Sequence, residues 1–322
     1  ARLGKRRRRR YGGGGGNDNN SGGDDDARRA ADRAYSIFRR MDENESKDDD
    51  SSSINARRAD AYSYNTVLNA LANAGGPQCA DRALDLLDEM KRRSYSDPTL
   101  RPDAFTYTSA IKAVASSGEP DAADDAVELL RDMTAPPSAA AYNAAIDALA
   151  RSGQGVEGAL KAEGLLDEMD GTSPRGDDAE FGSSDGNEDA TPNVITYTSA
   201  IKAWAAASAA SAASSAKAAS ASAESEGVSP SDPSDAPAER AERLLRRMIS
   251  RHRRTGDADL QPDAAAYAGA IKAWADSDAR DKGPRAEGLL RSMMMDGTPA
   301  DDDDDDDDAG GGGGAGGGLP PN

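Results

Sequence analysis

Two residue types that often carry catalysis occur only once each in this 322-residue chain, as Cys79 and His252. A zinc site made of cysteine and histidine needs four such ligands, so the chain cannot build one alone. A single cysteine also excludes an internal disulfide. His252 stands among Arg251, Arg253 and Arg254, in a solvated basic stretch that does not favour nucleophilic catalysis. We therefore expect no enzymatic activity and no cofactor.

Short polar residues recur at two fixed places and are better candidates for binding. One set directly follows a tyrosine in five similar segments: Asn65, Thr108, Asn143, Thr198 and the nonpolar exception Ala268. The other set lies just before each of these segments: Asp60, Asp103, Ser138, Asn193 and Asp263. Such side chains can hydrogen-bond to a ligand, but they are also preferred as helix caps. Both interpretations stay open at this point.

Two apolar patterns must position these polar residues. The first runs from a tyrosine to apolar residues four and seven positions later: Tyr64-Leu68-Leu71, Tyr107-Ile111-Val114, Tyr142-Ile146-Leu149, Tyr197-Ile201-Trp204 and Tyr267-Ile271-Trp274. The second is Ala-x-x-Leu-Leu-x-x-Met, which begins at Ala83, Ala126, Ala162, Ala241 and Ala286, with a variant at Ala34. Spacings of three and four place the apolar residues on one helix face. The patterns predict pairs of amphipathic helices.

A helix pair of this kind cannot bury its apolar stripe alone and must stack on its neighbours. Because strand signals are essentially absent, we expect an all-α solenoid of stacked helix-turn-helix repeats. The repeat domain should cover residues 27–293, with about five and a half repeats and insertions near 170–190 and 205–237. The second insertion is rich in alanine and serine, and its alanine run should extend the preceding helix.

Both ends of the chain have compositions typical of disorder. Residues 1–26 are rich in arginine and glycine, and residues 294–322 contain the octet Asp301 to Asp308 followed by glycines. Such segments bury too little apolar surface to offset chain entropy. The octet lacks the alternating spacing and turn glycine of a calcium loop, so we expect no metal site there. Most of the net charge of −19 lies in residues 170–190 and 294–322, outside the part expected to pack, and no apolar run is long enough to span a membrane.

The repeat resembles the pentatricopeptide repeat (PPR). The resemblance lies in Tyr64-Asn65-Thr66 at the head of the first helix, the Leu-Leu-x-x-Met pattern in the second, and Pro102-Asp103 before the next unit. Pro192-Asn193 and Pro262-Asp263 repeat the closing signature. The tetratricopeptide repeat, with a different aromatic and glycine pattern, fits worse. The resemblance implies a right-handed α-solenoid that reads one base of single-stranded RNA per unit.

The same resemblance implies which side chains read bases. It pairs the residue after each tyrosine, on a helix face that we expect to be open to the solenoid's groove, with the closing residue of the same unit. Asn65 with Asp103 resembles a uracil-reading pair, Thr108 with Ser138 departs from the common pairs and favours a purine weakly, Asn143 with Asn193 resembles a pyrimidine reader, and Thr198 with Asp263 resembles a guanine reader. Ala268 has no base-reading side chain.

Three lysines are candidates for contacts with the RNA backbone. Lys112, Lys202 and Lys272 each lie four residues after the residue that follows a tyrosine, and so share its helix face. A solubilising surface is the alternative interpretation. Trp204 and Trp274 occupy stripe positions and are expected in the core. The residues two before each tyrosine, such as Tyr62 and Phe105, are better placed for apolar contact with a base.

The predicted function is sequence-preferring binding of single-stranded RNA, in organellar RNA processing, stability or translation. The resemblance places the protein in a mitochondrion or chloroplast, with RNA-processing proteins as further partners and no membrane association. The alternative function is a protein-binding α-solenoid scaffold without RNA specificity, which the acidic balance and the alanines Ala140 and Ala265 favour.

Overall fold

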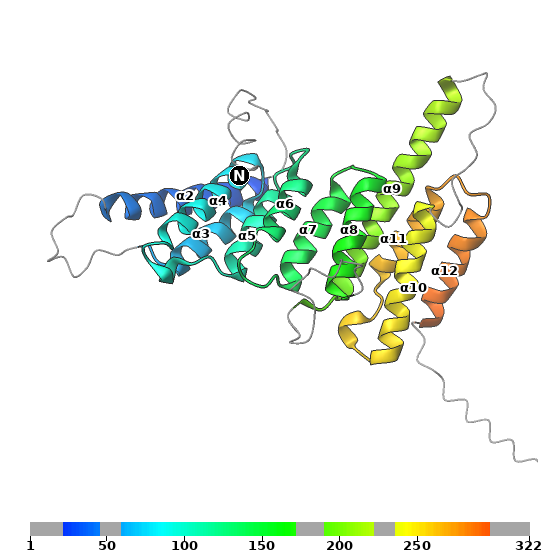
Figure 1. The fold of residues 1–322 in the computed structure, drawn as a ribbon. Helices are drawn as coiled ribbons and strands as arrows, with labels where there is room; N and C mark the ends of the chain where they lie inside the picture. The colour runs from blue at the N-terminus through cyan, green and yellow to red at the C-terminus, as the bar shows by residue number, and fades with distance from the viewer. Residues whose placement is uncertain (1–21, 46–58, 172–189, 222–235, 297–322) are drawn as a thin grey trace, which may run out of the picture.

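The structure, a computed structural model, describes residues 22–45, 59–171, 190–221 and 236–296. These ranges contain eleven α-helices and two short 3-10 helices, and no strand occurs in them. Figure 1 shows the helices standing side by side in one elongated stack. Within the described part of the chain, no helix is both long and apolar enough to span a membrane. The prediction of an all-α fold is confirmed, whereas the handedness of the solenoid stays a prediction.

A single helix precedes five helix pairs. The single helix is α2 (Gly22–Glu45), which carries the variant stripe. The pairs are α3 (Ala61–Ala74) with α4 (Pro77–Arg93), α5 (Ala104–Ala115) with α6 (Ala122–Arg131), α7 (Ala139–Arg151) with α8 (Val156–Met169), α9 (Val194–Ala221) with α10 (Pro237–Thr255), and α11 (Ala264–Ala275) with α12 (Lys282–Asp296). The 3-10 helices η1 (Pro98–Leu100) and η4 (Ala258–Leu260) precede α5 and α11. Each pair thus holds one tyrosine stripe and one Leu-Leu stripe.

The helices pack in two layers. The first helices α3, α5, α7, α9 and α11 contact one another in succession. Each second helix packs against the first helix of its own pair. The second helices α4, α6, α8 and α10 also pack against the first helix of the next pair, and α2 packs on α3 in the same way. One pair therefore completes the burial of the pair before it, as expected for a solenoid.

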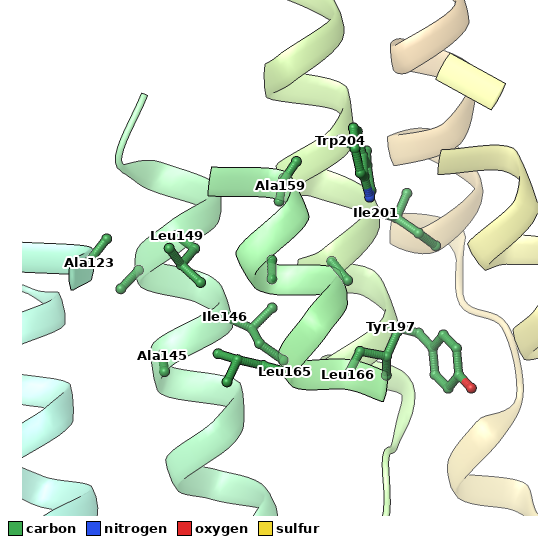
Figure 2. Packing of buried hydrophobic residues seen from close by; sticks show 14 of the residues in the cluster. Ala123, Ala145, Ile146, Leu149, Ala159, Leu165, Leu166, Tyr197, Ile201 and Trp204 are labelled. Carbon is green, nitrogen blue, oxygen red and sulfur yellow. The ribbon is translucent and has the colours of Figure 1, made fainter. Parts of the chain in front are cut away.

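The apolar stripes form the core of this stack. Figure 2 shows Ile146 of α7 beside Leu165 of α8, with Tyr197, Ile201 and Trp204 along one side of α9. All five are buried and belong to one continuous cluster. Burying one such side chain contributes about 1.5–3 kcal/mol. The junctions between pairs are thus the main source of stability, and they fix where each unit's polar residues lie.

Some boundaries differ from those expected. Helix α2 begins at Gly22 rather than near residue 27, and α12 continues to Asp296. As expected, by contrast, the alanine run after Trp204 is helical as far as Ala221, so the first part of the insertion at 205–237 extends α9. Alanine has the highest helix propensity, which accounts for the extension. Figure 1 shows the end of α9 projecting past its neighbours. Residues 172–189 and 222–235, and most of both predicted tails, lie outside the described residues.

Candidate functional site

The residue that closes each unit is the N-cap of the next first helix. Asp103, for example, accepts a hydrogen bond from the backbone N–H of Thr106 at 2.7 Å. The same bond recurs for Asp60 with Ser63, Ser138 with Ala141, Asn193 with Thr196 and Asp263 with Ala266. An N-cap of this type contributes about 1 kcal/mol because it satisfies a backbone donor that the helix leaves free. The capping role that the sequence left open is therefore confirmed.

Each of the last four caps also meets the residue that follows the preceding unit's tyrosine. The four separations between polar atoms are similar: Asn65 Nδ2 to Asp103 Oδ2 3.5 Å, Thr108 Oγ1 to Ser138 Oγ 3.4 Å, Asn143 Nδ2 to Asn193 Oδ1 3.3 Å, and Thr198 Oγ1 to Asp263 Oδ1 3.4 Å. The partners are 30 to 65 residues apart in the sequence. The fold thus brings together all four pairs suggested by the family resemblance, one at each of four successive junctions.

The exposure of these pairs differs from our expectation of an open face. Thr108 and Thr198 are only 7% and 5% exposed, and the hydroxyl of Thr108 donates to Ala104 O in its own helix at 2.7 Å. The next unit's N-cap covers them, because the first helices pack directly on one another. Their closing partners are more open, since Ser138 is half-buried and Asp263 is exposed. The accessible part of each threonine-containing pair therefore belongs mainly to the closing residue.

The exposure of Ala268 supports the explanation that the next unit covers the residue after each tyrosine. It is exposed, and it follows the tyrosine of the last described pair, where no further unit packs within the described residues. Asn65 and Asn143 are half-buried between these extremes. Accessibility after the tyrosine is therefore set by the neighbouring unit rather than by the position on the helix alone.

The sequence interpretation overlooked two threonines at the asparagine-containing junctions. Thr106 Oγ1 donates to Asn65 Oδ1 at 2.7 Å, and Thr196 Oγ1 donates to Asn143 Oδ1 at 2.6 Å. Both threonines are fully buried. Each stands three residues after a closing residue, a spacing typical of a capping box, and this signal could have identified them.

The three predicted lysines and the residues two before each tyrosine lie at the surface. Lys112, Lys202 and Lys272 are exposed, and in the described parts of the chain none of them forms an ion pair. Tyr62 is 79% exposed, and Phe105, Ala140, Ile195 and Ala265 are exposed as well. Single exposed apolar side chains are common at protein surfaces, so this exposure alone assigns them no function.

Both tryptophans are buried, which confirms that they belong to the core. Trp204 Nε1 donates to Glu163 Oε2 at 3.0 Å, and Trp274 Nε1 donates to Glu242 Oε2 at 2.9 Å. An arginine of the following helix covers each ring, Arg240 at 5.1 Å from the Trp204 centroid and Arg285 at 5.3 Å from that of Trp274. Neither ring is available to stack on a base.

Part of the arginine-rich end of α10 is engaged in contacts within the protein. Arg247 and Arg251 form ion pairs with Asp170, next to the end of α8. Tyr197 also donates to Asp170 Oδ2 at 3.0 Å, and burial raises the pKa of its phenol. His252 Nδ1 lies 2.7 Å from Asp257 O, beyond the helix end. These contacts serve the α8–α9–α10 junction, whereas Arg253 and Arg254 of the same cluster are exposed.

Two further kinds of information about the site are negative, namely metal-ligating clusters in the described residues and the comparison with curated proteins. In residues 22–45, 59–171, 190–221 and 236–296, no three His, Cys, Asp or Glu side chains gather as a metal ion would require. A comparison with curated proteins finds no match to the chain.

The family comparison, by contrast, identifies the repeat. The model of the PPR repeat matches residues 62–95, which span α3 and α4. A helix pair with the same stripes follows four more times, and the first helix of each of these four pairs begins at the same kind of cap. Residues 62–95 therefore match a PPR repeat, and the four helix pairs that follow are arranged in the same way.

Proposed function

We propose that this protein binds single-stranded RNA with sequence preference, using one polar pair at each of four junctions. The PPR family is a family of helical-repeat RNA-binding proteins. The observation that carries the proposal is the recurrence of a paired short polar contact, 3.3–3.5 Å long, between every two successive first helices from α3 to α11. Helix capping requires only one member of each pair, so capping alone does not account for the other.

The burial of Thr108 and Thr198 assigns different roles to the two members of a pair. The closing residue, half-buried at Ser138 and exposed at Asp263, makes the direct contact with the base edge. The buried threonine holds the cap side chain and limits which edge fits against it. On this basis the bound sequence is uracil at the first junction, a weakly preferred purine at the second, a pyrimidine at the third and guanine at the fourth, in the 5′ to 3′ direction.

The surrounding exposed residues supply contacts that do not depend on sequence. Tyr62, Phe105 and Ile195 offer apolar or aromatic surface to the faces of bases, and stacking of a base on an aromatic ring contributes about 1–3 kcal/mol. Lys112, Lys202 and Lys272 are placed to meet phosphates, which makes binding dependent on salt. The third and fifth units carry alanine at the apolar position, so they should bind most weakly.

We further propose a role in organellar RNA processing, stability or translation, with RNA-processing proteins as additional partners. PPR proteins are commonly organellar and are generally binders rather than enzymes. Since no catalytic constellation was identified in the sequence, we assign this chain to the binding class. It would shield a transcript or recruit a processing factor.

A substitution at the fourth junction tests the base assignments. Thr198→Asn should move the preference at the fourth nucleotide from guanine toward uracil while leaving total affinity nearly unchanged, because it changes which base edge fits against Asp263 and alters no phosphate contact. The measurement is a selection from randomised oligonucleotides, followed by binding curves for the selected sequences. Thr66→Asn, at an exposed position of α3, makes the same change outside any of the four pairs and serves as the control. An unaltered preference in Thr198→Asn would refute the assignment.

Salt dependence distinguishes RNA binding from a protein scaffold. Affinity for a selected oligonucleotide should fall steeply between about 50 and 200 mM salt, because lysine contacts release counterions from phosphates. Replacing Lys112, Lys202 and Lys272 with glutamine should flatten this slope without changing the base preference. A protein that ignores every oligonucleotide at low salt would favour the scaffold function instead.

A further inference from the structure

The residue at the third position of each first helix is matched to the pair beside it. Where the residue after the preceding tyrosine is asparagine, the next helix has threonine three residues after its cap; this holds for Asn65 with Thr106 and for Asn143 with Thr196. Where that residue is threonine, the third position is alanine: Ala141 next to Thr108 and Ala266 next to Thr198. All four junctions follow this rule, so the third position varies together with the paired residue.

The hydrogen bonds at the first junction explain the match. Thr106 Oγ1 accepts from the backbone N–H of Asp103 at 3.2 Å, so its single proton is free to be donated. Two acceptors lie within reach of this hydroxyl: Asn65 Oδ1 is 2.7 Å and Asp103 Oδ1 is 2.8 Å from Thr106 Oγ1. Asp103 Oδ1 already accepts a hydrogen bond from the Thr106 N–H. If the hydroxyl donates to Asn65, both acceptor oxygens therefore receive a hydrogen bond. The site is buried, where an unsatisfied oxygen would cost about 1–3 kcal/mol.

The other end of the Asn65 amide reinforces this orientation. With Oδ1 toward Thr106, Nδ2 faces Asp103 Oδ2 at 3.5 Å. A flipped amide would set Oδ1 against the carboxylate oxygen, two acceptors without a proton between them. The third junction repeats the arrangement, with Thr196 Oγ1 2.6 Å from Asn143 Oδ1 and Asn143 Nδ2 3.3 Å from Asn193 Oδ1. Both asparagines thus keep their donor nitrogen toward the cap.

A threonine in the paired position has no amide to orient. The Thr108 hydroxyl donates to Ala104 O in its own helix at 2.7 Å, so its direction is already fixed from within the helix. Ala141 and Ala266 are completely buried at the third position of the next helix. A further hydroxyl in that place would have no asparagine oxygen to meet.

We propose that Thr106 and Thr196 are positioning residues that fix the amides of Asn65 and Asn143, so that these asparagines present only a donor to the bound base. The inference rests on the proposed RNA binding and adds a third residue to two of the four junctions. With Oδ1 tied to the threonine, the remaining Nδ2 proton selects base edges that carry an acceptor. Loss of the hydroxyl frees the amide to offer either group, and selectivity falls.

Thr106→Val tests the proposal at the first junction, because it removes the hydroxyl and keeps the side-chain volume. Selectivity for the preferred base at the first nucleotide should fall about three- to tenfold, as expected for one hydrogen bond, while selectivity at the fourth nucleotide stays unchanged. Thr106→Ser keeps the hydroxyl and should retain the selectivity. Ser63→Ala removes a third-position hydroxyl that contacts only its own cap, Asp60, and controls for loss of capping.

A measurement without RNA separates failure of this inference from failure of the proposed function. In 15N spectra of asparagine-labelled protein, the Asn65 side-chain amide should exchange its protons with water faster in Thr106→Val than in the wild type. Its signals are assigned by comparison with Asn65→Asp. Unchanged exchange overturns the positioning role whether or not the protein binds RNA. Faster exchange in a protein that binds no RNA leaves the positioning role intact and refutes the function.

A transplant of the first junction into the fourth provides the gain-of-function test. Thr198→Asn combined with Ala266→Thr places an asparagine and a threonine beside Asp263, which is the set of residue types found at the first junction. The double variant should prefer uracil at the fourth nucleotide about three- to tenfold more strongly than Thr198→Asn alone. Equal preferences in a double variant that is as stable as the single one would overturn the proposal.

Discussion

The inner pair α9–α10 and the last described pair α11–α12 carry the same two stripes but bury them to different extents. Leu245 of α10 is fully buried, whereas its counterpart Leu290 of α12 is 45% exposed. Ala205 is buried in α9, and the equivalent Ala275 is exposed in α11. The difference shows that a stripe residue owes its burial to the next pair in the stack. The same dependence governs Thr198 and Ala268, so stability and site geometry have one common origin.

Matched leucine substitutions should separate the two pairs most clearly. Leu245→Ala leaves a cavity in a completed junction and should lower the free energy of unfolding by about 2–5 kcal/mol. Leu290→Ala removes a side chain that is already half in water and should cost below about 1 kcal/mol. Urea unfolding followed by circular dichroism measures both. Equal losses would mean that α12 is covered in solution by a partner, for example a second copy.

Hydrogen exchange should reveal the same contrast in the unaltered protein. Amides of α11 and α12 should exchange at least about tenfold faster than those of α7 and α8, because opening the last pair breaks one junction rather than two. Mass spectrometry of peptides from the four helices gives the rates. Helix α2 at the other end of the stack provides an internal comparison and should also exchange fast. Uniform protection along the stack would argue against a nearest-neighbour origin of stability.

The two-helix units could be predicted from the sequence because each carries its own periodic stripe. The pairs of the candidate site, such as Asn65 with Asp103, came from the family resemblance, and the structure places them within contact. The burial of Thr108 was not predictable in this way, since the cover comes from a different unit. Thr106 was overlooked because its contact with Asn65 joins residues 41 positions apart. Periodicity describes one helix, whereas these features belong to a junction.

The smallest expected effect concerns two helix caps, Asp60 near the first end of the stack and Ser138 inside it. Asp60 is ionisable and Ser138 is not. The hydroxyl and backbone N–H of Ser63 donate to Asp60 and lower the pKa of this carboxyl. A lowered pKa in the folded state gives stability that is present above the unfolded value of about 4 and is lost as the pH falls through the folded-state pKa. Asp60→Ala should therefore cost about 1 kcal/mol at pH 7 and less at acidic pH.

Ser138→Ala is the inner counterpart, and its cost should not change with pH because a serine cap does not titrate. Both variants are compared with the wild type by urea unfolding at pH 7 and at pH values below 4. The difference between Asp60→Ala and the wild type should shrink toward zero on acidification while that of Ser138→Ala persists. If both differences shrank together, loss of the stack as a whole, rather than titration of Asp60, would explain the acid response.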